Sequence, residues 1–210
     1  MMISHAILPK SFYERDTRVV AFELLGKRLV FKGAKSVFSG MVVETEAYLG
    51  SEDPASHAFR GPTPRNRIMF GSPGFSYVYF TYGFHHCFNV TTEREGVAGA
   101  VLIRAVEPLL GIDSMKQNRN CISELINLTN GPGKLAQAFG LSREHSGLDL
   151  TSNEFHFETG VYSPYLWIGT SSRIGIKHGK EYDYRFFIQD SPYVSKAPKV
   201  SSGGKSNAVA

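Results

Sequence analysis

The chain has 210 residues, of which 42% are hydrophobic and 20% charged. These ordinary proportions exclude global disorder, and the length suits one domain with a substantial core. Two cysteines without CxxC spacing exclude a disulfide framework, so Cys87 and Cys121 are predicted to be free buried thiols in a reducing compartment. The N-terminus has no apolar run long enough for a signal peptide, and no segment approaches a membrane span, which predicts a cytoplasmic protein.

The net charge of +4 is concentrated near the C-terminus. From residue 171 onward, seven basic residues stand against three acidic ones, a difference that equals the whole excess. The seven are Arg173, Lys177, Lys180, Arg185, Lys196, Lys199 and Lys205. Arg60, Arg65 and Arg67 form a second basic focus. Such clusters suit a surface that faces a polyanion, although charge that serves only solubility explains them equally well.

The first half of the chain predicts one helix and then several strands. Asp16 and Thr17 form the N-cap and first turn of a helix, and Gly26 stands where a C-cap is expected. The segments that follow are strands over residues 29–31 and 37–46, an irregular loop over 50–64, paired strands over 75–92, and a buried strand over 100–106 that Pro108 ends.

The second half predicts helices over residues 112–119 and 134–139 and short strands over 173–176 and 185–189. This irregular order lacks the strand–helix alternation of a doubly wound sheet. We therefore predict the α+β class, with a single domain over residues 1–200 built on a curved, mostly antiparallel sheet with flanking helices and a protruding β-hairpin. Residues 201–210 are predicted to be a flexible C-terminal tail.

Two carboxylates, Glu44 and Glu46, lie in the predicted strand over residues 37–46. Alternation in an extended strand places both on one face, roughly 7 Å apart at the backbone. That separation falls in the range that inverting glycoside hydrolases use to fit a water molecule between acid and base. A polar face paired with nearby arginines is the commoner explanation, but Val42, Val43 and Ala47 leave little of this strand in solvent. At least one of the two glutamates is therefore expected to line a cleft.

An aromatic face follows, because Phe75, Tyr77 and Tyr79 alternate with smaller residues along a predicted strand. Such a face is more often core than a ligand platform. Gly83 indicates a turn or bulge, which places Tyr82 near a hairpin tip where there is no core to fill. A flat side chain at such a tip can wedge into a stack of nucleic-acid bases.

Metal and nucleotide motifs are weak in this sequence. His85, His86 and Cys87 are adjacent and have no second ligand pair at metal-binding spacing, so no metal is predicted. The segment over residues 131–134 is not a Walker A loop, yet it offers backbone N–H groups and Lys134 to one phosphate. No dinucleotide fingerprint or nucleophile elbow occurs, and no cofactor is predicted.

Taken together, these motifs resemble the alkyladenine (3-methyladenine) DNA glycosylases. The matching segments, all in the family's order, are residues 44–50, His57, residues 63–67, 77–79 and 82–83, Asn89, and residues 102–108, 131–135 and 191–195. They extend from about Tyr13 to Ser195, which is most of the chain. The stretches over residues 84–86 and 91–99 match no fixed family pattern, which leaves the contacts of the hairpin with DNA and the preference among lesions open.

The resemblance implies a monofunctional base-excision repair enzyme that works as a monomer without a cofactor. It flips an alkylated or deaminated purine (3-methyladenine, 7-methylguanine, hypoxanthine or ethenoadenine) out of double-stranded DNA and hydrolyses the N-glycosidic bond. No lysine stands in the motif as a Schiff-base nucleophile, so abasic-site lyase activity is not expected.

The resemblance also implies a role for individual residues. Glu46 is the general base that activates water, while Arg104 and the backbone of Val194 help to hold that water. Tyr48, His57 and Tyr79 form the walls of the base pocket. The remaining implied roles are a gate against the amine of guanine at Asn89 and a wedge at Tyr82. The charge pattern, and not the resemblance, predicts that Arg65, Arg67, Lys134 and the basic C-terminal segment neutralise DNA phosphates. Glu44 has no assigned chemistry in this family.

Two other classes of protein stay open at this point. One is a carbohydrate O-glycoside hydrolase that uses Glu44 and Glu46, which salt-sensitive DNA binding would count against. The other is a non-catalytic DNA-bending protein that uses Tyr82 as a wedge, which release of free base from alkylated DNA would exclude.

Overall fold

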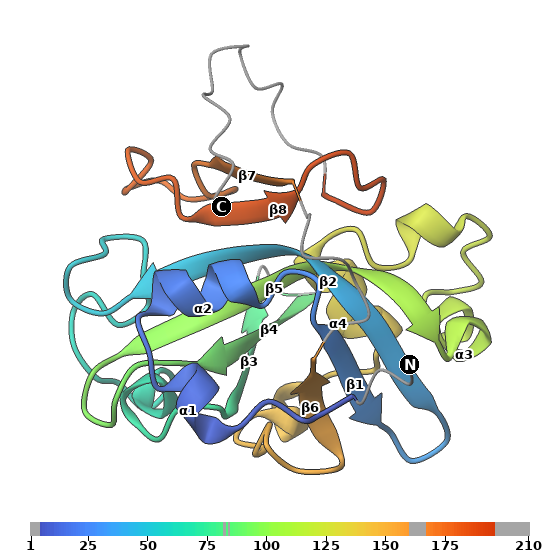
Figure 1. The fold of residues 1–210 in the computed structure, drawn as a ribbon, viewed down its shortest axis with the longest axis horizontal. Coiled ribbons are helices and arrows are strands. Elements are labelled where there is room, and N and C mark those ends of the chain that lie inside the picture. Colours follow the sequence, from blue (N-terminus) through green and yellow to red (C-terminus); the bar gives the residue numbers. More distant parts are fainter. Residues whose placement is uncertain (1–4, 82, 84, 160–166, 196–210) are drawn as a thin grey trace.

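The computed structural model describes residues 5–81, 83, 85–159 and 167–195. Within these residues, antiparallel strands form one eight-stranded sheet in the order β3-β4-β5-β2-β1-β6, and β8 joins β2 and carries β7 (Figure 1). The strands are β1 (Arg28–Lys32), β2 (Val37–Leu49), β3 (Ser76–Thr81), β4 (His85–Thr91), β5 (Gly99–Leu110), β6 (Phe155–Glu158), β7 (Ile168–Ser171) and β8 (Arg185–Ile188). The helices are α1 (Lys10–Tyr13), α2 (Thr17–Glu23), α3 (Ile112–Asn118) and α4 (Pro132–Ala138), with single 3-10 turns at η1 (Arg67–Phe70), η2 (Leu125–Asn127) and η3 (Arg143–His145).

Strand β2 is the centre of the sheet because three other strands pair with it. Strand β5 pairs with one edge over most of its length. On the other edge β1 pairs with its first part, and β8 pairs with residues 44–46. Residues 38–47 are all buried. The two glutamates of this strand therefore lie inside the protein, and any charge they carry must be compensated there.

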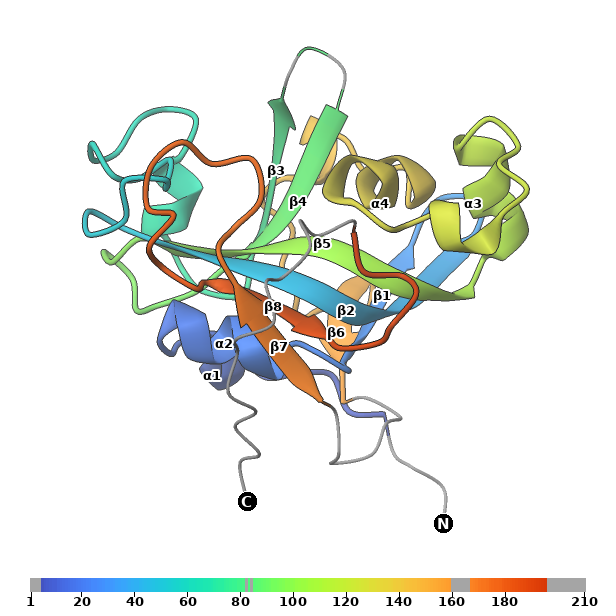
Figure 2. The same cartoon turned by 90° about the horizontal axis from the view of Figure 1, so that it is seen from above.

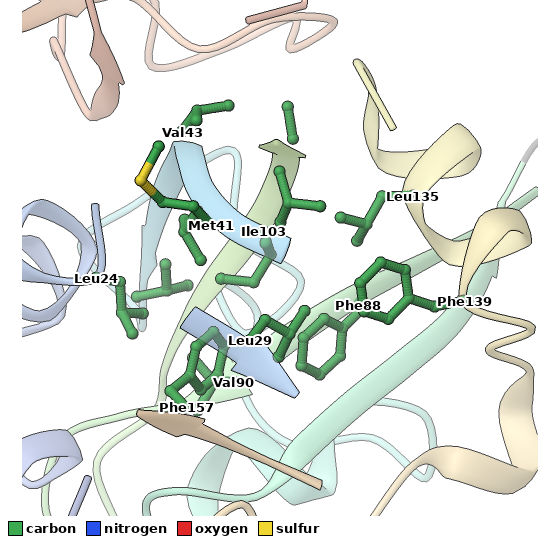
Figure 3. Packing of buried hydrophobic residues seen from close by; sticks show 14 of the residues in the cluster. Leu24, Leu29, Met41, Val43, Phe88, Val90, Ile103, Leu135, Phe139 and Phe157 are labelled. Carbon is green, nitrogen blue, oxygen red and sulfur yellow. The ribbon is translucent and has the colours of Figure 1, made fainter. Parts of the chain in front are cut away.

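The core lies between the sheet and the helices that flank it (Figure 3). Phe88 of β4 packs against Phe155 of β6 with ring centroids 4.9 Å apart. Phe139, which follows α4, lies beside Phe88, and Leu135 of α4 belongs to the same cluster (Figure 3). Helix α2 begins at its expected cap, because the Asp16 carboxylate accepts the Arg18 N–H over 2.8 Å.

The hairpin of β3 and β4 projects from the sheet (Figure 2). It pairs with β5 only through Asn89, Val90 and Thr91, so its outer half extends beyond the neighbouring strand. Gly83 has a φ of 77°, a left-handed conformation that glycine adopts at little cost in a tight turn. Tyr82 lies outside the described residues. The fold thus confirms the predicted single α+β domain with a curved antiparallel sheet, flanking helices and a protruding hairpin.

Three local predictions were wrong. Pro108 does not end its strand, since β5 continues to Leu110, and a register shift between Ser39 and Gly40 lets Pro108 stand opposite Gly40. Residues 173–176 form a loop instead of a strand, because their polar groups bond to side chains of the site described below. Both thiols are free, but only Cys87 is buried, whereas Cys121 is exposed.

Candidate active site

The buried glutamates of β2 share one arginine. Arg104 of β5 donates from Nε to Glu44 Oε1 over 3.0 Å, and its Nη1 lies 3.2 Å from Glu46 Oε2. Both carboxylates therefore point to the same face of the sheet, as strand alternation predicts. Burial disfavours the guanidinium cation, but Glu46 and Glu44 outweigh this effect and raise the pKa of Arg104. The site holds two carboxylates around one permanent cation.

Glu44 accepts four hydrogen bonds. Its Oε1 accepts from Arg104 Nε, from Arg185 Nε over 2.6 Å and from Ser195 Oγ over 2.8 Å. Its Oε2 accepts the Ser195 N–H over 2.8 Å. Of the three residues that supply these donors, only Arg104 lines the cavity described below. Glu44 thus ties β2, β5, β8 and the segment after β8 together.

Glu46 has a different environment although it is equally buried. Its Oε1 accepts the Ile174 N–H over 2.7 Å, and its Oε2 accepts the Tyr48 hydroxyl over 2.8 Å and faces Arg104. The described residues therefore supply two hydrogen bonds and one ion-pair contact to about four acceptor positions, which leaves capacity for a proton of water. Tyr48, Ile174 and Arg104 all line the same cavity, so the carboxylate lies directly behind its wall. Neither Glu44 nor Glu46 lines the cavity itself, so the prediction that at least one of them does was wrong.

That cavity has a volume of about 230 Å³ and is lined by parts of β2, β3, β4, β5, the loop after β2 and the loop between β7 and β8. It is smaller than the roughly 300–1,000 Å³ typical of sites for drug-sized ligands, so it suits a single flat ring system. Five residues that the sequence singled out line it: Tyr48, His57, Tyr79, Asn89 and Arg104. In Figure 2 the two loops stand beside the hairpin, above the sheet.

Aromatic rings form one wall of the cavity. Tyr79 lies 4.6 Å from the His57 ring in an edge-to-face arrangement and 5.2 Å from Tyr77. The Tyr77 hydroxyl is 2.9 Å from His57 Nδ1, and Asn66 Nδ2 donates to the His57 carbonyl over 2.7 Å. Burial raises the pKa of both tyrosines, so their hydroxyls stay protonated at neutral pH. The wall combines a face for stacking with polar groups fixed in place.

His57 stands at the mouth of the cavity, where the residue is exposed on one side. Partial burial of its ring, with a contribution from the charge of Arg65, lowers the pKa of His57 below its ordinary value. The imidazole is accordingly neutral at physiological pH.

Asn89 faces the cavity from β4. Its Nδ2 donates to the Tyr77 carbonyl over 3.0 Å, which fixes the orientation of the amide. The residue is paired with Tyr77 of β3 and with Leu102 of β5. A rigid amide at this place can reject a ligand by shape as well as by hydrogen bonding.

The candidate DNA-binding residues each lie near a residue that lines the cavity, in space or along the chain. Arg65 is exposed, with its guanidinium 5.1 Å from the Tyr79 ring centroid. Arg67 is exposed at the start of η1, whose Met69 lines the cavity. Lys134 is half-buried, two residues after the cavity-lining Pro132, and its Nζ donates to Asn130 Oδ1 over 2.7 Å.

Two of the seven basic residues counted from residue 171 onward do not lie on the surface, so the charge-based interpretation was wrong for these two, while Lys196, Lys199 and Lys205 lie outside the described residues. Arg173 and Arg185 are 3% and 0% exposed and form ion pairs with Asp53 and Glu44. A buried, paired guanidinium cannot neutralise a phosphate of a partner. Lys177 and Lys180 are exposed.

Sequence patterns missed several residues of the site. Tyr77 and the loop residues Ile174, Gly175 and Ile176 line the cavity. The aromatic alternation already contained a signal for Tyr77, but nothing local indicated that a backbone N–H of the loop would reach Glu46. Val194 is half-buried, and its N–H donates to the Ser191 carbonyl over 3.3 Å. The predicted role of its backbone in holding water stays a prediction.

Two further observations concern the part of the chain that the structure describes. No group of three His, Cys, Asp or Glu residues is arranged there to hold a metal ion. No helix in these ranges is long and apolar enough to cross a membrane.

Known proteins match nearly the whole chain. Residues 11–192 match the family model described as methylpurine-DNA glycosylase (MPG). A protein of Prosthecochloris aestuarii, named as a candidate 3-methyladenine DNA glycosylase, is 48% identical over 201 residues, which are 95% of this chain and 96% of the relative. A protein of the same name from Carboxydothermus hydrogenoformans is 47% identical over 90% of this chain and 99% of its own length. The chain therefore belongs to the methylpurine-DNA glycosylase family and is a hydrolase that acts on N-glycosyl bonds.

Proposed function

We propose that this DNA glycosylase excises alkylated or deaminated purines from double-stranded DNA as a monofunctional base-excision repair enzyme. The single observation that carries the proposal is the position of Glu46, a carboxylate with acceptor capacity left, behind the wall of a cavity sized for one flat ring system. The substrates proposed are 3-methyladenine, 7-methylguanine, hypoxanthine and ethenoadenine.

The proposed reaction uses water as the nucleophile. Glu46 accepts a proton from a water molecule that Arg104 and the Val194 backbone help to hold, and the water oxygen attacks C1′ of the flipped nucleotide. The N-glycosidic bond breaks, and its electron pair leaves with the base. An alkylated purine is cationic and departs readily, so the protein has mainly to position water and exclude undamaged bases. General-base assistance of this kind contributes about 10²–10⁴ in rate.

The proposed recognition follows from the walls of the cavity. Tyr48 and Tyr79 stack on the flipped base, a contact worth about 1–3 kcal/mol per base, and His57 hydrogen-bonds to it. Asn89 rejects guanine through its exocyclic amine. Tyr82, assigned from sequence alone, fills the gap in the stack and reduces the cost of flipping, which is a few kcal/mol. We also retain the predictions of a monomer and of a cytoplasmic location, which rest on the sequence and the family.

The test is release of free base from DNA that carries one defined lesion. We expect chromatography to detect the free purine while the strand stays intact until alkali cleaves the abasic site. Strand cleavage without alkali would contradict the monofunctional mechanism. Tight binding without any released base, for every lesion tried, would favour the DNA-bending alternative. The carbohydrate alternative needs Glu44 as a second catalytic carboxylate, but Arg185 and Ser195, which bind Glu44, do not line the cavity.

Binding to a lesion duplex is expected to weaken with salt. If Arg65, Arg67 and Lys134 each neutralise one phosphate, log affinity falls against log salt with a slope of about −3, and each alanine variant reduces the slope by about 1. Fluorescence anisotropy over a salt series measures this. Lys10→Ala is a matched control, since Lys10 is exposed on α1, on the opposite side of the sheet from the hairpin (Figure 2). An affinity that does not change with salt concentration would show that these cations do not contact phosphates.

The choice of lesion is expected to depend on pH through His57. Below its lowered pKa the ring becomes cationic and repels a cationic base such as 7-methylguanine, whereas neutral hypoxanthine is affected less. The single-turnover rate for 7-methylguanine divided by the rate for hypoxanthine should therefore fall as pH drops through the acidic range below 6.5. His57→Gln should remove this trend. A ratio in wild type that is constant over pH would contradict contact of His57 with the base.

A further inference from the structure

Arg173, on the loop between β7 and β8, is a buried cation that the reaction above does not use. Its Nη2 donates to Asp53 Oδ1 over 2.7 Å, and its Nη1 donates to Asp53 Oδ2 and, over 2.8 Å, to the Ala47 carbonyl. The guanidinium also lies over the rings of Tyr48, at 4.7 Å, and Tyr184, at 5.3 Å. Burial disfavours the cation, but Asp53 more than offsets this and raises the pKa of Arg173. The guanidinium is charged and held from several sides.

The contacts of Arg173 converge on Glu46. Ala47 follows Glu46 directly in β2, and the Tyr48 ring beneath the guanidinium carries the hydroxyl that donates to Glu46 Oε2. Ile174, the next residue after Arg173, donates its N–H to Glu46 Oε1 over 2.7 Å. Both hydrogen-bond donors to Glu46 therefore sit on groups that Arg173 fixes.

Asp53 extends the same link to the other loop of the cavity. Its Oδ2 accepts the Leu49 N–H over 3.1 Å, and its Oδ1 accepts the Ala55 N–H over 3.0 Å. Ala55 lines the cavity, as do residues 174–176 on the side of Arg173. The buried Asp53–Arg173 ion pair thus joins the loop after β2 to the loop between β7 and β8, across the general base.

We propose that Arg173, held by Asp53, is a positioning residue for base excision. It fixes the Ile174 N–H and the Tyr48 ring and thereby sets the orientation of the Glu46 carboxylate toward the attacking water. Arg173 itself does not touch the substrate. The inference rests on the proposed role of Glu46 as general base.

Arg173→Met tests the proposal, since methionine fills much of the space but lacks the charge and the forked donors. The single-turnover excision rate is expected to fall about 10–100-fold, as misplacement of a catalytic group by about 1 Å can cost that much. Affinity for the lesion duplex should stay within about two-fold, because Arg173 is buried away from DNA phosphates. Arg173→Lys keeps the charge without the bidentate geometry and should recover only part of the rate.

Arg28→Met is the matched control. It also removes an arginine from an ion pair, with Glu158 at 3.4 Å, but that pair joins β1 to β6 and neither residue lines the cavity. Its excision rate should equal that of the wild type.

A loss of folding is separated from a loss of positioning by a double variant. Arg173→Met leaves Asp53 buried without its cation, so its melting temperature should fall. Asp53→Asn combined with Arg173→Met removes both charges and keeps one acceptor for the Leu49 or Ala55 N–H, so it should raise the melting temperature again in part. All rates are taken well below each melting temperature. A double variant with a restored melting temperature and a low rate supports the proposal.

Three outcomes would overturn it or its basis. A rate that recovers together with the melting temperature means that Arg173 only holds the fold. A wild-type rate in folded Arg173→Met also removes the positioning role. A wild-type protein that releases no base overturns the proposed function first, and that result is seen before any variant is made.

Discussion

Glu46→Gln is expected to lower the single-turnover rate of base excision by about two to four orders of magnitude, the usual contribution of a general base. Glutamine keeps the size of the side chain and can still accept the Ile174 N–H, but it cannot take a proton from water. Binding to the lesion duplex should be retained, because Glu46 is buried behind the cavity wall and contacts no phosphate. The measurement is excision at saturating enzyme beside the affinity for the same duplex.

Glu23→Gln is the control for this substitution, since Glu23 is exposed on α2 in an ion pair with Arg15 at 2.8 Å. Its rate should match the wild type. A rate of Glu46→Gln within a few-fold of the wild type would remove Glu46 from the mechanism. Glu44 would then be the next carboxylate to test as the general base.

Glu44→Gln is expected to affect stability more than any exposed substitution. The change leaves the buried guanidiniums of Arg104 and Arg185 without their shared anion, and breaking a buried ion pair costs about 3–5 kcal/mol. A typical domain is stable by only about 5–15 kcal/mol, so this is a large share of the total free energy of unfolding. Urea unfolding followed by circular dichroism measures the shift of the midpoint.

Glu23→Gln is again the comparison, because the same chemical change at an exposed ion pair should cost no more than about 1 kcal/mol. If the Glu44→Gln protein unfolds at the same urea concentration as the wild type, the four hydrogen bonds to Glu44 do not stabilise the fold. A stable Glu44→Gln protein with no excision would instead point to a role of Glu44 in the chemistry.

Local sequence predicted correctly those elements in which the spacing of hydrophobic residues and the turn residues indicate the same structure. The alternation around Tyr77 and Tyr79, closed by Gly83, predicted the hairpin of β3 and β4. The apolar run around Glu44 and Glu46 predicted a strand with little exposure and with both carboxylates on one face, and β2 has both properties. In these segments the backbone conformation depends on neighbours in the sequence, so the pattern carries the information.

Local sequence failed where a distant partner sets the conformation. Residues 173–176 have the composition of a strand, but Arg173 bonds to Asp53 and the Ile174 N–H bonds to Glu46, so this segment is a loop over the cavity. The positive charge of Arg173 and Arg185 suggested a surface for a polyanion, and both side chains are buried in ion pairs. A count of charges contains no information on which of them are compensated inside the protein.

The sequence by itself determined that two carboxylates lie on one face of a buried strand, beside an aromatic platform and a motif shared with DNA glycosylases. Only the tertiary structure decided which carboxylate lies beside the cavity. Arg185 and Ser195 stand 141 and 151 residues after Glu44 and bind it without lining the cavity, whereas Tyr48 and Ile174, the hydrogen-bond donors to Glu46, both line it. The basicity and access of a carboxylate depend on the donors within about 3 Å of its oxygens, and here those donors come from strands and loops that only folding brings together.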